Sequence, residues 1–199
     1  RYGVSVCVKH FCCNEKEANK LAQDVRVSER ALREIYLKPF EMAVKDGKAQ
    51  GIMSSYNLVN GVAMNENKDI LTNILRGEWG YQYYISGDWN NNKDMVKEIN
   101  AGHGVREPYT YCNIDTVITA INEGKISRET LLTGAKYELN TLMRGKRNYS
   151  KWTKAICNGN HTFVNDVCSV CHAPNPQVFN SLDSTVDSLV DNMTKNVGL

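Results

Sequence analysis

SERALREIYLKPFEMAVKDGKAQGIMSSY, residues 28–56, contains the pattern that decides the fold. Ser28 is suited to cap a helix that runs to about Lys45, and Pro39 is expected to kink it. The apolar residues recur at helical spacing: Leu32, Ile35, Tyr36, Phe40 and Ala43. The pattern then changes to a short apolar run, Gly51–Tyr56, which is typical of a buried strand. A helix that leads into a buried strand is half of a β-α-β unit.

The same alternation continues on both sides of this stretch. Two more apolar runs, Val4–Lys9 and Tyr83–Asp88, are predicted strands. The predicted helices are Asp69–Arg76, Asp115–Asn122 and Arg128–Arg144, the last with Ser127 as its N-cap and Gly145 as its stop. This order predicts an α/β fold with a parallel sheet, either a barrel or an open doubly wound sheet. The sequence has neither G-x-G-x-x-G nor G-x-x-x-x-G-K-Ser/Thr, which disfavours nucleotide binding.

Composition excludes several classes of protein. The 199 residues carry a formal net charge of +2, which argues against a polybasic nucleic-acid or membrane-surface protein. Hydrophobic residues make up 42%, enough for a globular core. No run reaches the roughly 18 apolar residues of a membrane-spanning helix. The chain begins at Arg1, without a leader, and almost at once enters an apolar strand. We therefore expect a processed or truncated chain whose beginning lies elsewhere.

The character of the sequence changes after Gly145. Residues 1–145 form the predicted α/β part, and residues 146–199 form a small cysteine-containing tail with a predicted helix over residues 182–193. Seven cysteines leave at least one thiol unpaired. Cys168-Ser169-Val170-Cys171-His172 matches the C-x-x-C-H pattern of c-type haem attachment, with Met193 as a possible axial ligand. Disulfides that involve Cys157, or a zinc site of Cys157, Cys168, Cys171 and His172 or His161, are the other interpretations.

Three N-x-Ser/Thr acceptors lie in this tail, at Asn148, Asn160 and Asn192. They are glycosylation sites if the chain passes through a secretory pathway, or chance in an asparagine-rich sequence. Acceptors interleaved with cysteines favour an oxidising compartment, secreted or lysosome-like.

Each predicted strand ends in polar residues. The first ends at Lys9-His10, the second at residues 54–57 and the third at Asp88-Trp89. In parallel α/β barrels the catalytic groups sit at the carboxyl ends of strands, so these side chains are expected to meet at one face. Asp88 suits a nucleophile, a general base or a metal ligand, or else the N-cap of a helix starting near Asn90.

The neighbouring side chains also have two interpretations each. Lys9 and His10 suit hydrogen bonds to substrate hydroxyls, or a salt bridge and a satisfied core histidine. Tyr56 either presents its hydroxyl to the same pocket or fills space. Trp89 suits stacking on a sugar ring, or ordinary packing.

Several linked motifs resemble glycoside hydrolase family 3. They are KHF at 9–11 with Asn14, SERALREIYLKPFEMAV at 28–44, IMSSYNLVNGV at 52–62, LRGEWGY at 75–81, GDW at 87–89 and ISRETLLTGAKYELNTLMRG at 126–145. The resemblance implies the later part of a (β/α)₈ TIM-type barrel and hydrolysis of β-linked glycosides with retention of configuration, without a cofactor. It implies that Asp88 is the nucleophile. It also implies that the terminal sugar contacts Lys9, His10, Met53, Tyr56 and Trp89.

This sequence departs from the family pattern in several places. The earlier barrel strands and the domain that usually carries the acid/base glutamate have no counterpart, so they must come from the same polypeptide or from a partner chain. Gly87 stands where the family most often has serine, and AGHGVREP at 101–108 replaces an acidic-apolar segment. Cys12 and Cys13 replace the Pro-Gly of the N-acetylglucosaminidase branch, which disfavours that branch. A non-catalytic relative with a structural or carbohydrate-binding role is the alternative function.

Overall fold

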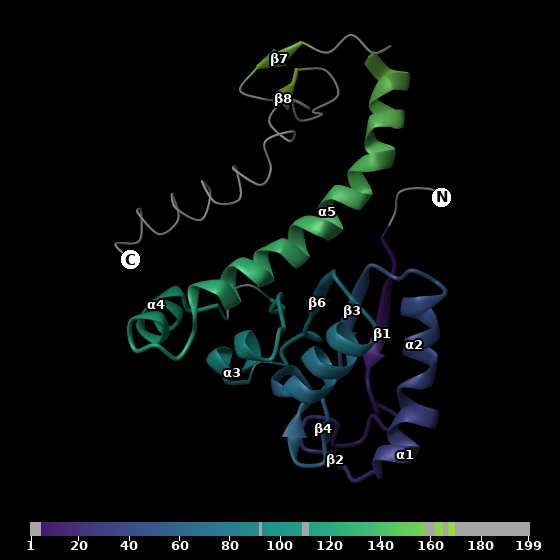
Figure 1. The fold of residues 1–199 in the computed structure, drawn as a ribbon, viewed down its shortest axis with the longest axis vertical. Coiled ribbons are helices and arrows are strands. Elements are labelled where there is room, and N and C mark those ends of the chain that lie inside the picture. The colour runs from purple at the N-terminus through teal and green to yellow at the C-terminus, as the bar shows by residue number, and fades with distance from the viewer. Residues whose placement is uncertain (1–4, 92, 109–111, 158–161, 165–166, 170–199) are drawn as a thin grey trace. The chain divides into compact units, whose positions relative to one another are not determined.

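The computed structural model describes residues 5–91, 93–108, 112–157, 162–164 and 167–169 (Figure 1). These residues belong to two compact units, one spanning Ser5–Thr141 and the other containing the chain from Leu142 onward. The division predicted between residues 145 and 146 stays a prediction. Within the described residues, no helix combines the length and the apolar character needed to span a membrane.

A parallel sheet forms the centre of the first unit. Its strands are β1 (Cys7–Phe11), β3 (Gly51–Ser54) and β6 (Tyr84–Ser86), in the order β1-β3-β6. Ile52 pairs in register with Val8 on one side and Ile85 on the other. The three predicted strands and their parallel pairing are confirmed, although β1 begins and ends later than Val4–Lys9. Val105 extends the sheet beyond β6 through an isolated parallel bridge to Ser86.

A second, smaller sheet lies in the connections. It contains β2 (Asp24–Val25), β4 (Leu58–Val59) and β5 (Val62–Ala63), in that order. The pairs β2–β4 are parallel and β4–β5 antiparallel. In the other unit, β7 (Phe163–Val164) and β8 (Val167–Cys168) form an antiparallel pair.

The predicted helix over residues 28–45 is present in three segments. They are α1 (Glu29–Ala31), a π-helical turn η1 (Leu32–Tyr36) and α2 (Lys38–Lys45), and Ser28 Oγ caps the first by accepting from Ala31 N at 3.3 Å. Pro39 lies in the first turn of α2, where its missing N–H costs no hydrogen bond. The π-turn adds one residue to the helical repeat, so Leu37 is buried while Ile35 is 62% exposed. The helical spacing of Ile35 therefore does not make it part of the buried face.

The remaining helices follow the prediction in part. The 3₁₀ turn η2 (Met64–Glu66) precedes η3 (Asp69–Glu78), a π-helix that is longer than the predicted Asp69–Arg76. Helix α3 (Met95–Asn100) was not predicted, and α4 (Ile114–Asn122) was. Helix α5 (Arg128–Cys157) begins as expected, with Ser127 Oγ accepting from Thr130 N at 3.0 Å. Gly145 does not stop it. A helical glycine costs only about 1 kcal/mol relative to alanine, and no proline follows before Cys157.

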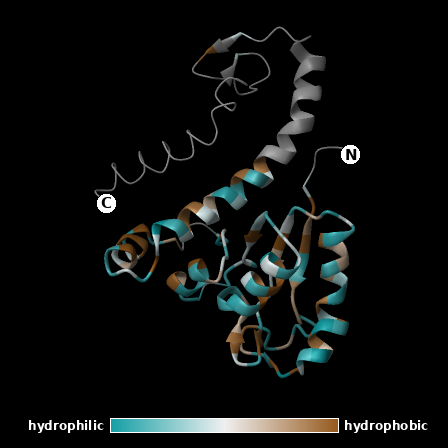
Figure 2. Cartoon of the chain, viewed as in Figure 1, coloured by the Kyte–Doolittle hydropathy of each residue, from teal (hydrophilic) through white to brown (hydrophobic). Residues whose placement is uncertain are grey.

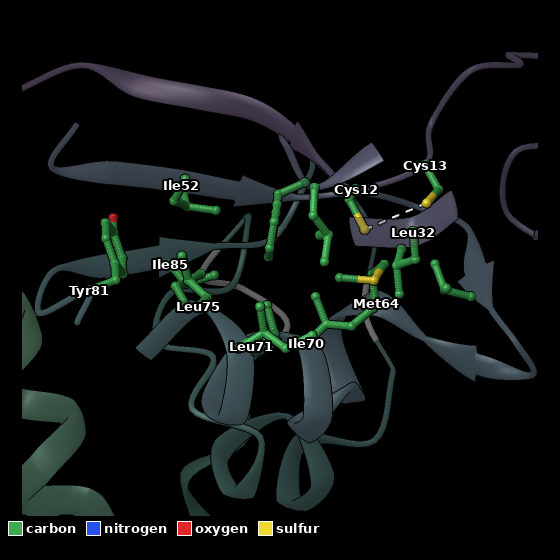
Figure 3. Packing of buried hydrophobic residues seen from close by; sticks show 14 of the residues in the cluster. Cys12, Cys13, Leu32, Ile52, Met64, Ile70, Leu71, Leu75, Tyr81 and Ile85 are labelled. Atoms are coloured by element: carbon green, nitrogen blue, oxygen red, sulfur yellow. Dashed lines mark hydrogen bonds between the residues drawn. The ribbon is translucent and has the colours of Figure 1, made fainter. Parts of the chain in front are cut away.

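The hydrophobic core joins the sheet to these helices. Figure 3 shows Ile52 and Ile85 of the sheet near Leu71 and Leu75 of η3, with Cys12, Cys13, Leu32 and Met64 beyond them. Helix α2 shows mostly hydrophilic residues in the view of Figure 2, and its buried residue is Val44. Phe11, at the end of β1, packs edge-on against Phe40 at 5.0 Å and Trp79 at 6.1 Å between ring centroids. This packing fixes the end of β1, which carries Lys9 and His10.

Candidate active site

Asp88 lies just beyond the carboxyl end of β6, and both of its carboxylate oxygens have partners. Oδ2 is 3.1 Å from His10 Nε2, and Oδ1 accepts the Trp89 backbone N–H at 2.8 Å. The backbone N–H of Gly87 donates to the Val105 carbonyl at 2.8 Å and fixes the strand end behind it. The carboxylate is therefore oriented from two sides while its side chain remains 14% exposed.

The helix-cap interpretation of Asp88 is wrong. Helix α3 begins at Met95, and its N-cap is Asp94, whose Oδ1 accepts from Val96 N at 2.9 Å and Lys97 N at 3.2 Å. Asp94 meets the capping need that the alternative assigned to Asp88. The Asp88 carboxylate is thus available for another role.

His10 comes from the end of β1 and reaches Asp88 across the sheet. Its side chain is 30% exposed, so it is not a core histidine. Lys9, the preceding residue, is exposed, and its ammonium group has no ion pair or hydrogen bond among the described residues, so the salt-bridge interpretation of Lys9 finds no support there.

Tyr56 and Trp89 connect the second and third strand ends. The Tyr56 hydroxyl donates to the Trp89 carbonyl at 2.6 Å. Burial and the negative charge of Asp88 raise the pKa of Tyr56, so the phenol keeps its proton. Trp89 is 57% exposed, which argues against the packing interpretation and leaves its ring surface accessible.

Met53 lies one residue before the end of β3, in register with Ser86, and is partly exposed. Strand alternation places Met53 on the face opposite to that of buried Ile52. The structure thus brings His10, Tyr56, Asp88 and Trp89 into direct contact at one edge, with Lys9 and Met53 on the same strands. That these residues contact a sugar stays a prediction.

Lys20 is a site residue that the sequence did not single out. Its Nζ lies 4.4 Å from the centroid of the Tyr56 ring and 2.8 Å from Glu17 Oε2. Glu17 is the main cause of the raised pKa of Lys20, and the charge of Asp88 contributes to it. Lys20 lies in a polar loop without periodicity, so no sequence pattern placed it near the site.

A buried polar network supports the strand ends from behind. Glu98 is 1% exposed, and its carboxylate pairs with Arg106 Nε at 2.5 Å and accepts Lys93 N–H at 2.9 Å. Asn65 Nδ2 donates to the Asn91 carbonyl at 2.6 Å, and Asn91 Nδ2 to the Ser55 carbonyl at 2.8 Å. Because these bonds connect the end of β3 with the segment after Asp88, the network holds the site backbone in place.

His103 belongs to this network and not to the reacting face. It is buried, its Nε2 lies 3.4 Å from Ser54 Oγ, and burial lowers its pKa to about 4. The imidazole is therefore neutral at neutral pH and carries no extra proton to donate. Glu107 contributes its carbonyl, which accepts the Asn90 N–H at 2.8 Å.

Gly87 passes close to the same network. A Cβ atom at Gly87 would lie 3.3 Å from Asn65 Nδ2 and 3.4 Å from His103 Nε2. Glycine therefore suits this position, where the family most often has serine.

The predicted glycosylation sites and the residues of the C-x-x-C-H motif lie largely outside the part of the chain that the structure describes. Asn148 falls within the backbone of α5, while Asn160 and Asn192 lie outside the described residues. Of the tail motif, the backbone of Cys168 is described in β8, and Cys171, His172 and Met193 lie outside. Within the described part of the chain, no three His, Cys, Asp or Glu side chains gather to hold a metal ion.

Curated relatives resemble most of this chain. It is 35% identical over 144 residues to β-glucosidase B of Emericella nidulans, covering 71% of this chain and 17% of the relative. It is 39% identical over 143 residues to a β-glucosidase of Rhizobium radiobacter, covering 71% and 18%. It is 40% identical over 125 residues to an exo-α-(1→6)-L-arabinopyranosidase of Bifidobacterium breve, covering 63% and 16%. The chain thus spans less than a fifth of the length of each.

Comparisons with solved structures and with a family model point to the same group of proteins as these relatives. A family 3 β-glucosidase of Bifidobacterium adolescentis matches 75% of the chain and 22% of its own, with a TM-score of 0.70 and 36% identity. The β-glucosidase of Kluyveromyces marxianus matches 83% and 20%, with a TM-score of 0.73 and 32% identity. The sequence model described as the glycosyl hydrolase family 3 N terminal domain matches residues 1–131. This chain belongs to glycosyl hydrolase family 3.

Proposed function

We propose that this chain supplies the nucleophile and much of the sugar subsite of a retaining β-glycosidase that removes terminal β-linked sugars. The observation that carries the proposal is the His10–Asp88 pair at 3.1 Å, formed across parallel strand ends beside Tyr56 and the exposed ring of Trp89. A carboxylate in this position, oriented on both oxygens yet accessible, meets the geometric need of a nucleophile.

In this mechanism Asp88 attacks the anomeric carbon as the glycosidic C–O bond breaks. A second carboxyl group protonates the leaving oxygen, and water later displaces Asp88 from the glycosyl–enzyme intermediate, giving net retention. The His10 contact and the Trp89 N–H keep the attacking carboxylate in one orientation. The exposed face of Trp89 suits stacking on the C–H face of a pyranose.

The proposal includes parts that lie outside this chain. Sheet β1-β3-β6 with its extension at Val105 corresponds to the later part of a (β/α)₈ barrel, and the earlier strands would pair with its free edges. We expect those strands and the acid/base residue from the same polypeptide or from a partner chain. Residues 146–199 would form a disulfide-containing tail, glycosylated at Asn148, Asn160 and Asn192, in a secreted or lysosome-like protein.

A trapping experiment tests the function. The complete enzyme is treated with a 2-deoxy-2-fluoro β-glycoside carrying a good leaving group, digested and analysed by mass spectrometry. We expect a covalently bound sugar on Asp88, since the fluorine slows both formation and hydrolysis of the intermediate, whereas the good leaving group accelerates only its formation. Asp94→Asn serves as the matched control and should label normally, because asparagine caps a helix as well as aspartate does.

The alternative gives a different result. A non-catalytic relative would bind the sugar without becoming labelled. Labelling at another carboxylate would contradict the assignment of Asp88 while leaving a retaining glycosidase in place.

A further inference from the structure

Cys12 and Cys13 form a pair of neighbouring thiols that the proposed glycosidase chemistry does not use. Their Sγ atoms lie 3.6 Å apart, and both thiols are free (Figure 3). Cys12 is 0% and Cys13 2% exposed, within the same core cluster as Leu32 and Met64. Two consecutive buried cysteines could serve only as small apolar side chains in the core. Here the contact between their sulfurs also places each sulfur where it can react with the other.

We propose that Cys12 and Cys13 form a redox-active dithiol that hydrogen peroxide converts into a vicinal disulfide. This inference is independent of the glycosidase proposal. It assigns a modification site at the turn that follows β1.

The backbone of this turn is held in place around the pair. The Cys12 carbonyl accepts the Ser55 hydroxyl at 2.7 Å and Asn57 Nδ2 at 3.2 Å, and the Phe11 carbonyl accepts Ser55 N–H at 2.8 Å. Cys13 has a φ of 63°, in the left-handed region that non-glycine residues rarely occupy. These bonds hold the backbone of Phe11 and Cys12 in place. Ring closure requires the two sulfurs to move from 3.6 Å to about 2.05 Å apart.

The two thiols are not equivalent. The side-chain hydrogen bond between the two sulfurs lowers the pKa of Cys13, whereas the same contact and burial raise the pKa of Cys12. Since the thiolate is the reactive form, Cys13 is the attacking sulfur and Cys12 the resolving one.

Access to Cys13 comes through the loop that follows it. Residues 15–19 are exposed, and the backbone hydrogen bonds of the loop are Lys20 N to the Glu17 carbonyl at 3.3 Å and Ala22 N to the Asn19 carbonyl at 3.0 Å. A segment with so few internal bonds opens locally at low cost in free energy. Such an opening admits a water-sized oxidant to Cys13 without unfolding the core.

The reaction balances with hydrogen peroxide alone. The Cys13 thiolate attacks one oxygen, the O–O bond breaks, and hydroxide leaves to give a sulfenic acid. The Cys12 sulfur then attacks the Cys13 sulfur, the S–S bond forms, and the hydroxyl group leaves with the Cys12 proton as water. The two sulfurs lose two electrons, which reduce the peroxide to water.

The closed ring should be easy to reduce. Consecutive Cα atoms are about 3.8 Å apart, shorter than the roughly 4.4–6.8 Å of ordinary disulfides, so a vicinal bridge is strained. Strained disulfides are the labile and regulatory ones. We therefore expect a reversible modification.

Tryptic peptide mapping tests the proposal on the complete protein. After reduction, peroxide treatment and alkylation, the peptide His10–Lys16 contains Cys12 and Cys13 as its only cysteines. We expect it to lose both alkylation sites and to be about 2 Da lighter than the dithiol form, with dithiothreitol restoring it. Cys7 and exposed Cys112 fall in separate peptides, Tyr2–Lys9 and Glu107–Lys125, and serve as single-thiol controls.

Two single variants separate the roles. Cys12→Ser should leave a Cys13 sulfenic acid that dimedone traps, with at least a tenfold gain in labelling over the wild type. Cys13→Ser should show no such gain. The mapping of the wild-type protein decides the matter even if either variant fails to fold. Cys12 and Cys13 that stay fully alkylatable while Cys112 is oxidised, or that form disulfides to other peptides, would overturn the proposal.

Discussion

Two carboxylates of the unit Ser5–Thr141, each paired with a basic side chain, do different work. Asp88–His10 lies at the strand ends, where its side chains are 14% and 30% exposed. Glu98–Arg106 lies behind them, where its side chains are 2% and 10% exposed. The Asp88 carboxylate remains accessible to a ligand. The Glu98 carboxylate accepts hydrogen bonds from Arg106, Lys93 and Asn65. The difference teaches that a carboxylate serves chemistry or scaffolding according to how many of its lone pairs the fold already uses.

The largest expected effect follows from the proposal that the earlier barrel strands and the acid/base residue lie outside residues 1–199. Residues 1–199 alone should show no turnover of aryl β-glucosides, because positioned proton transfer is worth roughly 10²–10⁴ in rate and the other half of the pocket is also lost. The assay compares a substrate with a strongly acidic phenol and one with a poor leaving group. Robust, equal turnover of both by the isolated chain would show that the acid lies within it.

Asp88→Asn in the complete enzyme comes next. The amide keeps the shape of the side chain but removes the attacking charge, so kcat should fall by about 10³-fold or more. The melting temperature should change little, because a partly exposed pair contributes little to stability. Near-normal kcat would reject Asp88 as the nucleophile, and Asp94→Asn is again the control.

Glu98→Ala should have its main effect on stability, in contrast to Asp88→Asn, whose main effect is on kcat. It leaves the guanidinium of Arg106 buried without its main partner, which costs about 3–5 kcal/mol in the free energy of unfolding. Urea denaturation of the variant measures it. Glu78→Ala, which removes the exposed partner of Arg33, is the matched control and should cost about 1 kcal/mol or less. Equal losses in the two variants would refute the distinction between buried and exposed pairs.

The smallest expected effect is a pH dependence of stability caused by His103, which belongs to the buried polar network. Burial lowers the pKa of His103 to about 4, below the value of about 6.5 in an unfolded chain. The unfolded state therefore binds more protons, and the stability that neutral His103 contributes above pH 6.5 is lost as the pH falls toward 4, up to about 3 kcal/mol. His103→Asn should flatten the decline in unfolding free energy between pH 6.5 and 5.

Glu138 affects the pH dependence of stability in the opposite direction to His103, so a variant at Glu138 is the control. Burial raises its pKa to about 7, above the ordinary value of 4.5, so its contribution to stability is lost as the pH rises between these values. Glu138→Gln should therefore steepen the decline that His103→Asn flattens. Identical pH profiles for both variants would contradict the assigned burial of the two groups.

Local sequence alone determined much of the first unit. The alternation of strand and helix around residues 28–56 gave the parallel sheet, and Ser28 and Ser127 marked helix starts that the structure confirms. Polar residues after each strand located the edge where His10, Tyr56 and Asp88 meet. These features are predictable because periodicity, capping and strand direction depend on residues close together in the chain.

Tertiary structure decided the features that depend on distant partners. The π-turn at Leu32–Tyr36 exchanged Leu37 for Ile35 in the core, and α5 passed through Gly145. Lys20 contacts the Tyr56 ring from a loop without a sequence pattern, and Glu98 of α3 pairs with Arg106 in the segment that follows this helix. Ser55 and Asn57 of the neighbouring strand end hold the Cys12 carbonyl, and the sulfurs of Cys12 and Cys13 lie 3.6 Å apart in the core. Burial and charge pairing arise from the packed chain, so no local pattern encodes them.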